Sequence, residues 1–280
     1  MYMIAVTVII SLTIFVIIFT ALMFMRTRKN KVCLPTSPTI VYVTSCKKSM
    51  YDLYGKEFIK DLSGSTPPSD KIVVCTEDFT IPPMHNVHQY DISRYDWLKT
   101  WLHKNHDIIP PEFGGTCTGK LSYFNKNTSK WMRKVAAIRY AAHTFNFDIL
   151  IWIDIDSRLK QSIDDKIINK SFTDANVFYH QGYVRDYIRD MGIETGIVGF
   201  YGEPGKRVLD EWFRQYDSGE FRKLKRWDDG YVFREVMRNS DVQYNDMTGF
   251  SFGFEPVKSS PWSAYIEHLK GQHKEKQLYT

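Results

Sequence analysis

Apolar blocks alternate with polar segments along most of the chain, and their spacing predicts strands followed by helices. Compact β-branched runs predict strands at Thr39–Ser45 and Lys71–Asp78, with a shorter candidate at His85–Ser93. Residues 51–63 have the apolar spacing of a helix. A second helix is expected at Ser129–Phe145, because Ser129 can cap its first turn and its apolar residues fall on one face.

The second half of the chain continues this alternation. A run of bulky apolar residues predicts a buried strand at Ile149–Ile155, and Asp154 and Asp156 interrupt its end. Two strands and two helices are expected after it, at residues 175–181, 194–202, 204–216 and 228–238. The aromatic, Pro- and Gly-containing stretch Tyr95–Asn127 predicts a long irregular loop.

Alternating strands and helices predict a layered α/β domain with a largely parallel sheet. Ligands of such sheets bind outside the carboxyl ends of the strands. Asp154 and Asp156 lie at such an end, so we expect a ligand-binding site at this edge of the sheet.

The first 25 residues, Met1–Met25, contain no charged side chain. A bilayer span needs only about 20 such residues, and the basic start and cleavage site of a signal peptide are missing. We therefore expect a transmembrane anchor at 1–25, a linker at 26–38 and one folded domain at 39–280. Basic residues follow the span and none precedes it, which favours a single-pass protein facing the cytoplasm. Two glycosylation sequons, at Asn127 and Asn169, favour the alternative of a Golgi or ER lumen.

Composition narrows the function classes only a little. The chain has 280 residues and a dispersed net charge of +5, which does not indicate a nucleic-acid partner and is compatible with an anionic substrate such as a phosphate ester. Its four cysteines lack the spacing of a zinc site or a disulfide framework and are expected to be reduced thiols.

Asp154 and Asp156 carry the first candidate chemistry. Side chains two apart in a strand point the same way, with about 6.6 Å between their α-carbons. Two adjacent carboxylates repel unless something positive lies between them. Mn²⁺ or Mg²⁺ meets that need and keeps positions open for phosphate oxygens. The alternative is a pair of turn aspartates that cap local backbone amides.

A second motif lies near the carboxyl terminus, where His268, Gly271 and Lys274 are each three residues apart. An imidazole can complete a metal shell begun by carboxylates, and glycine lets the backbone approach a diphosphate closely. Lysine can neutralise a leaving diphosphate. Taken alone, the segment is typical of an ordinary polar tail.

Together these motifs resemble those of the GT-A glycosyltransferases, in which an aspartate pair after a central strand binds a metal that carries a nucleotide-diphosphate sugar. The spacing H-x-x-G-x-x-K resembles the carboxyl-terminal motif of the glycogenin-like branch. Residues 193–202 and 226–233 are similar to later segments of that branch and of the fungal and plant galactosyl- and mannosyltransferases. The anchor and small size also resemble glycosyltransferases of large DNA viruses.

The resemblance implies a GT-A fold with a mixed, mostly parallel sheet over about residues 39–276. It implies a metal-dependent enzyme that moves a sugar from a UDP- or GDP-sugar to a glycan or glycoprotein acceptor, with retention of configuration favoured. Asp156 would bind the metal directly, Asp154 would contact it through water or hold the ribose, and His268 would be the third protein ligand. Lys274 would neutralise the departing diphosphate beside Gly271.

The resemblance also implies further donor contacts. Thr44 and Ser45, placed just after the first strand, would meet the nucleotide base. One of three basic residues would meet a phosphate or the base edge: Lys130, Arg133 or Lys134. The sugar pocket would draw on Glu194, Thr195, Gly196, Asp228 and Asp229.

An inverting enzyme would also need a carboxylate to deprotonate the acceptor. Asp229 is the first choice and Glu194 the second, whereas Asp228 is also placed to cap the following helix. The aromatic residues Tyr95 and Trp97–Trp101 could stack on an acceptor sugar or lie in the core. Glu194 and Thr195 stand where the related families have asparagine and a small residue, so the resemblance does not fix the sugar.

Two other classes stay open. A phosphatase of the haloacid dehalogenase type would use Asp154 as a nucleophile, although that class places its aspartate pair on the first strand. A non-catalytic, membrane-tethered sugar-binding protein would bind metal and nucleotide sugar without turnover. Neither alternative accounts for the carboxyl-terminal motif.

Overall fold

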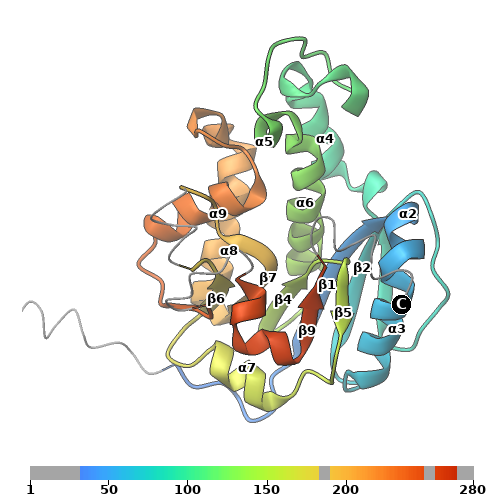
Figure 1. Ribbon diagram of the computed structural model, residues 1–280, viewed down its shortest axis with the longest axis vertical. Helices are drawn as coiled ribbons and strands as arrows, with labels where there is room; N and C mark the ends of the chain where they lie inside the picture. Colours follow the sequence, from blue (N-terminus) through green and yellow to red (C-terminus); the bar gives the residue numbers. More distant parts are fainter. Residues whose placement is uncertain (1–31, 183–189, 249–255, 270–280) are drawn as a thin grey trace, which may run out of the picture.

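A seven-stranded sheet forms the centre of the computed structural model, which describes residues 32–182, 190–248 and 256–269 (Figure 1). Its strand order is β3-β2-β1-β4-β7-β6-β8. The bounds of these strands are β1 Ile40–Lys47, β2 Lys71–Glu77, β3 Val87–Asp91, β4 Ile149–Ile153, β6 Val177–His180, β7 Glu194–Tyr201 and β8 Tyr244–Asp246. Two short strands, β5 (Ser157–Leu159) and β9 (Ile266–His268), form a separate antiparallel pair.

The central sheet is mixed and mostly parallel, as the sequence predicts. Strand β1 pairs in parallel with β2 and β4, and β2–β3 and β6–β8 are also parallel. Strand β7 is the exception, because it runs antiparallel to both of its neighbours, β4 and β6. The carboxyl end of β4 therefore lies beside the first residues of β7.

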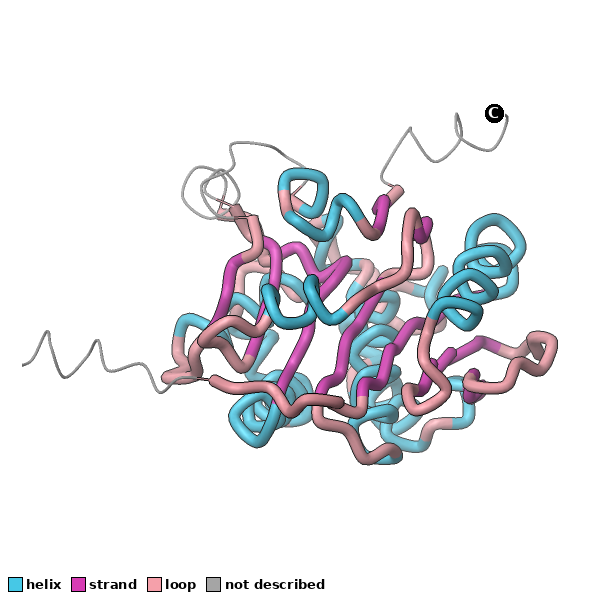
Figure 2. Tube along the Cα trace, turned by 90° about the horizontal axis from the view of Figure 1, so that it is seen from below, coloured by secondary structure: helices cyan, strands magenta, loops and turns pink. Residues whose placement is uncertain are grey.

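Helices cover both faces of this sheet (Figure 2). One face packs against α4 (Asp96–Lys104), α6 (Thr128–Thr144), α8 (Gly202–Asp217) and α9 (Asp229–Arg238). The other face packs against α3 (Lys56–Ser65) and α7 (Asp165–Ser171). The shorter helical elements are α2 Lys48–Met50, α5 Tyr123–Lys126, the π-helical turn Tyr51–Gly55, and 3-10 turns at Ile92–Arg94, His106–Ile108, Pro111–Phe113, Glu220–Lys223, Val257–Ser259 and Pro261–Ala264.

Successive side chains of a strand point to opposite faces of the sheet, so one sheet contributes residues to two hydrophobic cores. In β4, Leu150 and Trp152 enter the core under α6, whereas Ile149, Ile151 and Ile153 enter the core under α3 and α7. Since both faces are covered, every β4 position is buried, and the strand is a continuous apolar run. Asp154 follows Trp152 by two residues, so it emerges on the α6 side.

The structure corrects two expectations about elements. The predicted irregular loop Tyr95–Asn127 contains α4 and α5, because Leu98 and Trp101 bury one face of α4 against the core. Strand β1 continues through Lys47, so Thr44 and Ser45 lie within the strand and not after it.

The prediction of a single-pass membrane protein is contradicted. Within the described part of the chain, no helix has the length and apolar character needed to cross a bilayer. The predicted anchor itself, Met1–Met25, and part of the predicted linker lie outside the described residues.

Candidate metal and donor site

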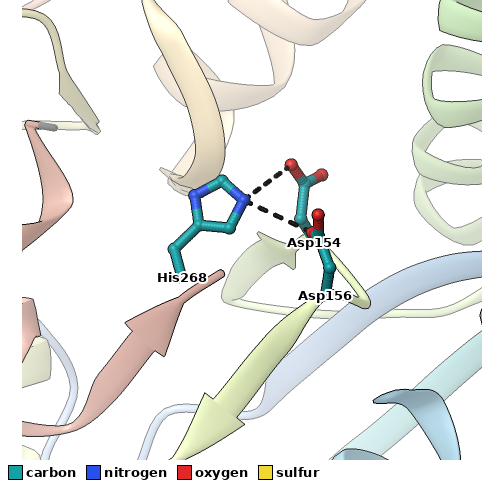
Figure 3. Close-up of side chains that lie close together, drawn as sticks. All are labelled: Asp154, Asp156 and His268. Carbon is teal, nitrogen blue, oxygen red and sulfur yellow. Dashed lines mark ion pairs between the residues drawn. The ribbon is translucent and has the colours of Figure 1, made fainter. Parts of the chain in front are cut away.

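Three side chains from two distant parts of the chain converge just beyond the end of β4 (Figure 3). His268 Nε2 lies 3.3 Å from Asp156 Oδ1 and 3.5 Å from Asp154 Oδ2. One ligand atom from each residue lies within 4.8 Å of the others. The side chain of His268 is only 6% exposed and that of Asp156 12%, so this cluster is largely screened from water.

The β5–β9 pair brings the histidine to the aspartates. Ser157 and His268 are partners across this antiparallel ladder, and the backbone N–H of Leu269 donates to the carbonyl oxygen of Asp156 at 2.9 Å. On the β7 side, the N–H of Asp154 donates to the carbonyl oxygen of Gly196 at 2.8 Å. Backbone hydrogen bonds thus fix both carboxylates relative to the imidazole.

The three groups suit a divalent cation. Two carboxylates and one imidazole are ligands for Mn²⁺, and they leave positions for oxygen atoms of a substrate. Nδ1 of His268 is buried without a hydrogen-bond partner among the described residues, and its nearest acidic neighbour is Glu194 Oε1 at 3.9 Å. The imidazole therefore faces the carboxylates through Nε2, the nitrogen that would bind a metal.

Lys134 of α6 links the aspartate pair to a second acidic group. Its ammonium nitrogen lies 2.9 Å from Asp154 Oδ1 and 2.9 Å from Asp229 Oδ2. It also donates to the carbonyl oxygen and the hydroxyl of Thr195, each at 3.2 Å. The hydroxyl of Thr195 in turn donates to Asp229 at 2.6 Å. One lysine thereby joins α6, β4, β7 and α9.

This lysine also sets the charge of Asp154. Burial would raise the pKa of that carboxyl, but Lys134, together with His268, holds it well below its ordinary value. The indole N–H of Trp152 donates to the same carboxylate at 2.8 Å. Asp154 is therefore an anion at every pH at which the protein is expected to act.

Gly196 makes room for the histidine ring, and this contact gives a prediction. A Cβ at position 196 would lie 2.5 Å from Cε1 and 2.6 Å from Nδ1 of His268. Because the ring must move away, Gly196→Ala is expected to weaken Mn²⁺ binding by about 10- to 100-fold while the fold is kept. Titration calorimetry with Mn²⁺ measures this. Gly64→Ala is the matched control, since nothing lies within 4 Å of a Cβ there; equal affinities in both variants would contradict the site.

His268 also gives a pH prediction. Burial would lower its pKa, but the carboxylates of Asp154 and Asp156 outweigh this and raise it from 6.5 to about 9. In the metal-free protein, the imidazolium therefore stabilises the fold fully below pH 6.5, and this contribution is lost as the pH rises through about 9. Urea denaturation in EDTA should show a loss of up to about 3 kcal/mol across this window. His268→Gln should not show it, and an equal loss in that variant would refute the assignment.

The residues predicted to form the sugar pocket divide into two groups. Glu194, Thr195 and Gly196 begin β7 and lie against His268 and Lys134, and Asp229 joins them through Thr195. Asp228 does not face this network. Its carboxylate caps α9 by accepting from the N–H of Tyr231 at 3.3 Å, and it pairs with Arg226 at 2.8 and 3.0 Å.

Of the three basic residues at the start of α6, only Lys134 reaches the aspartates. Arg133 donates to Glu77 at 2.8 Å and to the carbonyl oxygen of Ser129 at 2.7 Å. Lys130 is exposed, with its ammonium 5.4 Å from the ring centroid of Trp131. The expected donor contacts of Lys130 and Arg133 stay predictions.

The residues predicted to contact the nucleotide are placed only in part. Thr44 is buried, and its hydroxyl has no hydrogen-bond partner among the described residues, whereas Ser45 is half-buried. An orphaned hydroxyl of this kind is suited to a ligand contact. Gly271 and Lys274 lie outside the described residues, so their expected contacts with the diphosphate stay predictions.

Sequence reasoning did not single out Trp152 or Arg226. Trp152 orients Asp154 from two residues away, and an indole at this spacing before an aspartate pair is a usable signal. Arg226 pairs with Asp228 across the same two-residue spacing.

Comparison with known proteins gives distant structural neighbours only. The chain matches no protein-family model and no curated protein. Mouse xyloside xylosyltransferase 1 is similar in structure, with 9% identity, a TM-score of 0.45, and coverage of 74% of this chain and 84% of that chain. The glycosyltransferase GlyE of Streptococcus pneumoniae TIGR4 is similar with 14% identity, a TM-score of 0.42, and coverage of 85% of this chain and 55% of GlyE.

The bifunctional glycosyltransferase WbbM is a third neighbour, with 13% identity, a TM-score of 0.41, and coverage of 73% of this chain and 38% of WbbM. This chain thus spans about half the length of GlyE and well under half of WbbM. All three neighbours are glycosyltransferases, and at these TM-scores they fix neither the substrate nor the reaction of this chain.

Proposed function

We propose that this chain is a metal-dependent glycosyltransferase of the GT-A type, which moves a sugar from a UDP- or GDP-sugar to a glycan or glycoprotein. The observation that carries the proposal is the convergence of Asp154, Asp156 and His268 beside the Lys134–Asp229 pair. Departure of the diphosphate needs a bound cation, and transfer of the sugar needs a nearby carboxylate. The site offers ligands for the first and a buried carboxylate for the second, and Lys134 joins them.

The metal-binding half of the site would serve the leaving group. Asp156 and His268 would hold Mn²⁺ or Mg²⁺ directly, and Asp154 would hold it directly or through water. A divalent cation supplies Lewis-acid stabilisation of the departing diphosphate. The low pKa of Asp154 keeps the negative charge that attracts the cation.

The second half of the site would serve the sugar. Glycosyl transfer passes through an oxocarbenium-like state, which a nearby carboxylate stabilises. Asp229 is suited to this role, because Lys134 and Thr195 fix its orientation. Glu194, beside His268, is the second carboxylate of this region. Asp228 is better suited to positioning α9 than to chemistry, since its oxygens accept from Arg226 and Tyr231.

The phosphatase alternative has less support from this geometry. Its nucleophile would be Asp154, yet the carboxylate of Asp154 already contacts Lys134, Trp152 and His268. Strand β4 is also the fourth strand in chain order and not the first.

The proposal is tested by turnover of nucleotide sugars. The full chain would be incubated with a panel of UDP- and GDP-sugars in Mn²⁺ or EDTA, and release of UDP or GDP would be measured. We expect Mn²⁺-dependent release from one donor, and none in EDTA. Hydrolysis of p-nitrophenyl phosphate that is lost in Asp154→Asn, without release from any nucleotide sugar, would instead establish the phosphatase.

A further inference from the structure

An exposed aromatic side chain lies on α5, the short helix that precedes α6. Among the described residues, the exposed large hydrophobic side chains are Leu53, Phe113, Tyr123 and Tyr244. Tyr123 is the most exposed of them, at 60%. It belongs to α5, which leads into α6, the helix that carries Lys134 (Figure 1).

A series of side-chain contacts joins Tyr123 to Asp228, the N-cap of α9. The ring of Tyr123 meets the ring of Phe124 edge-on, with centroids 5.5 Å apart. The guanidinium carbon of Arg226 lies 3.4 Å from the centroid of Phe124, and Arg226 pairs with Asp228 at 2.8 Å. The residue after Asp228 is Asp229, the carboxylate that we propose acts at the sugar.

The backbone under Tyr123 is held on both sides. Ser122 caps α5 by accepting from the N–H of Asn125 at 3.2 Å, and the side chain of Asn127 donates to the carbonyl oxygen of Tyr123 at 2.8 Å. The N–H of Trp227 donates to Asn125 at 3.2 Å, which ties α5 to the segment before Asp228. A ring on so fixed a turn loses little entropy when it binds a ligand.

We propose that Tyr123, backed by Phe124 and Arg226, is the acceptor platform of this enzyme, on which one ring of a saccharide acceptor stacks. The inference rests on the proposed function and names the residue that would bind its carbohydrate acceptor. The apolar C–H face of a sugar ring fits an exposed aromatic ring, and the phenol hydroxyl can hydrogen-bond to the sugar edge. The contacts through Phe124 and Arg226 connect this ring to the start of α9, where Asp229 is the first helical residue.

The other aromatic residues considered for this role lie in the core or pack against it. Trp101 is 3% exposed, and Tyr95 and Trp97 pack against the core under α4 and α6. The indole N–H of Trp97 also bonds with the carboxylate of Asp217. Their aromatic faces are engaged by the protein, whereas that of Tyr123 is open.

The test measures saccharide binding separately from donor turnover. Saturation-transfer NMR would be recorded on the full chain with methyl glycosides of glucose, galactose, mannose and xylose, in Mg²⁺ and UDP or GDP. We expect transfer to the C–H protons of at least one glycoside, with about tenfold weaker binding in Tyr123→Ala and near wild-type binding in Tyr123→Phe. Tyr244→Ala is the matched control, because Tyr244 is 51% exposed on the edge strand β8.

Mn²⁺-dependent donor hydrolysis would be measured in parallel on the wild-type chain and on Tyr244→Ala. If Tyr123→Ala weakens glycoside binding while Tyr244→Ala binds the glycoside as tightly as the wild-type chain does, the platform is supported. If no glycoside binds, or if Tyr123→Ala and Tyr244→Ala bind equally well, the platform is wrong while donor turnover can still stand. Absence of donor turnover in the wild-type chain would overturn the proposed function and this inference with it.

Discussion

Replacing Asp156 with asparagine is expected to weaken Mn²⁺ binding by about 100-fold or more and to abolish release of UDP or GDP from the donor. The carboxylate of Asp156 lies 3.3 Å from His268 and its side chain is only 12% exposed, so water cannot readily replace it as a ligand. An amide of the same size keeps the packing but removes the charge. Calorimetric titration with Mn²⁺ and a steady-state assay measure the two effects.

The matched control for this variant is Asp165→Asn. Asp165 is an exposed carboxylate in the first turn of α7, nine residues along the chain. We expect its affinity for Mn²⁺ and its turnover to match those of the wild-type chain. Retained Mn²⁺ affinity in Asp156→Asn, with a cooperative unfolding transition, would remove Asp156 from the site.

Replacing Lys134 with methionine is expected to destabilise the metal-free protein by about 3 kcal/mol. The variant leaves Asp154 and Asp229 without the cation that lies 2.9 Å from each of them. Because the three side chains are 22% exposed or less, solvent screens these charges poorly. Mn²⁺ should restore more stability to the variant than to the wild-type chain, since it supplies positive charge beside Asp154.

Urea denaturation in EDTA and in Mn²⁺ measures this difference. Lys130→Met is the control, because Lys130 is exposed and lies over a ring rather than between carboxylates. It is expected to change the free energy of unfolding by less than about 0.5 kcal/mol. Equal stability of the two variants in EDTA would show that Lys134 does not hold the aspartates together.

Local pattern was sufficient to predict most of the sheet. Because helices cover both faces, β1, β2 and β4 are buried at most of their positions, and each contains a run of four or five consecutive apolar residues. Such runs identify strands without knowledge of their partners. The direction of β7 was not predictable, because a strand has the same pattern whether its neighbours run parallel or antiparallel. Strands β5 and β9 have three residues each, too few for a periodic signal.

The site was predictable where its residues are close in sequence or belong to a known motif. Asp154 and Asp156 follow one strand, and the resemblance to the carboxyl-terminal motif of the glycogenin-like branch indicated His268 as the third ligand. The sequence did not distinguish Lys134 from Lys130 and Arg133, because the rotation of α6 about its axis depends on how it packs on the sheet. The sequence did separate Asp228 from Asp229, because Asp228 stands where a cap of the following helix is expected. In the structure Asp228 caps α9 and Asp229 lies 2.9 Å from Lys134, whereas the catalytic role of Asp229 stays a prediction.

The most direct test of the central claim is calorimetric titration of the full chain with the nucleotide sugar that the turnover screen identifies, in Mn²⁺ and in EDTA. If Asp154, Asp156 and His268 hold a cation that holds the diphosphate, binding should be saturable in Mn²⁺ and lost in EDTA, in Asp156→Asn and in His268→Gln. Binding of equal affinity in EDTA, or in both variants, would contradict a metal-held donor at this site.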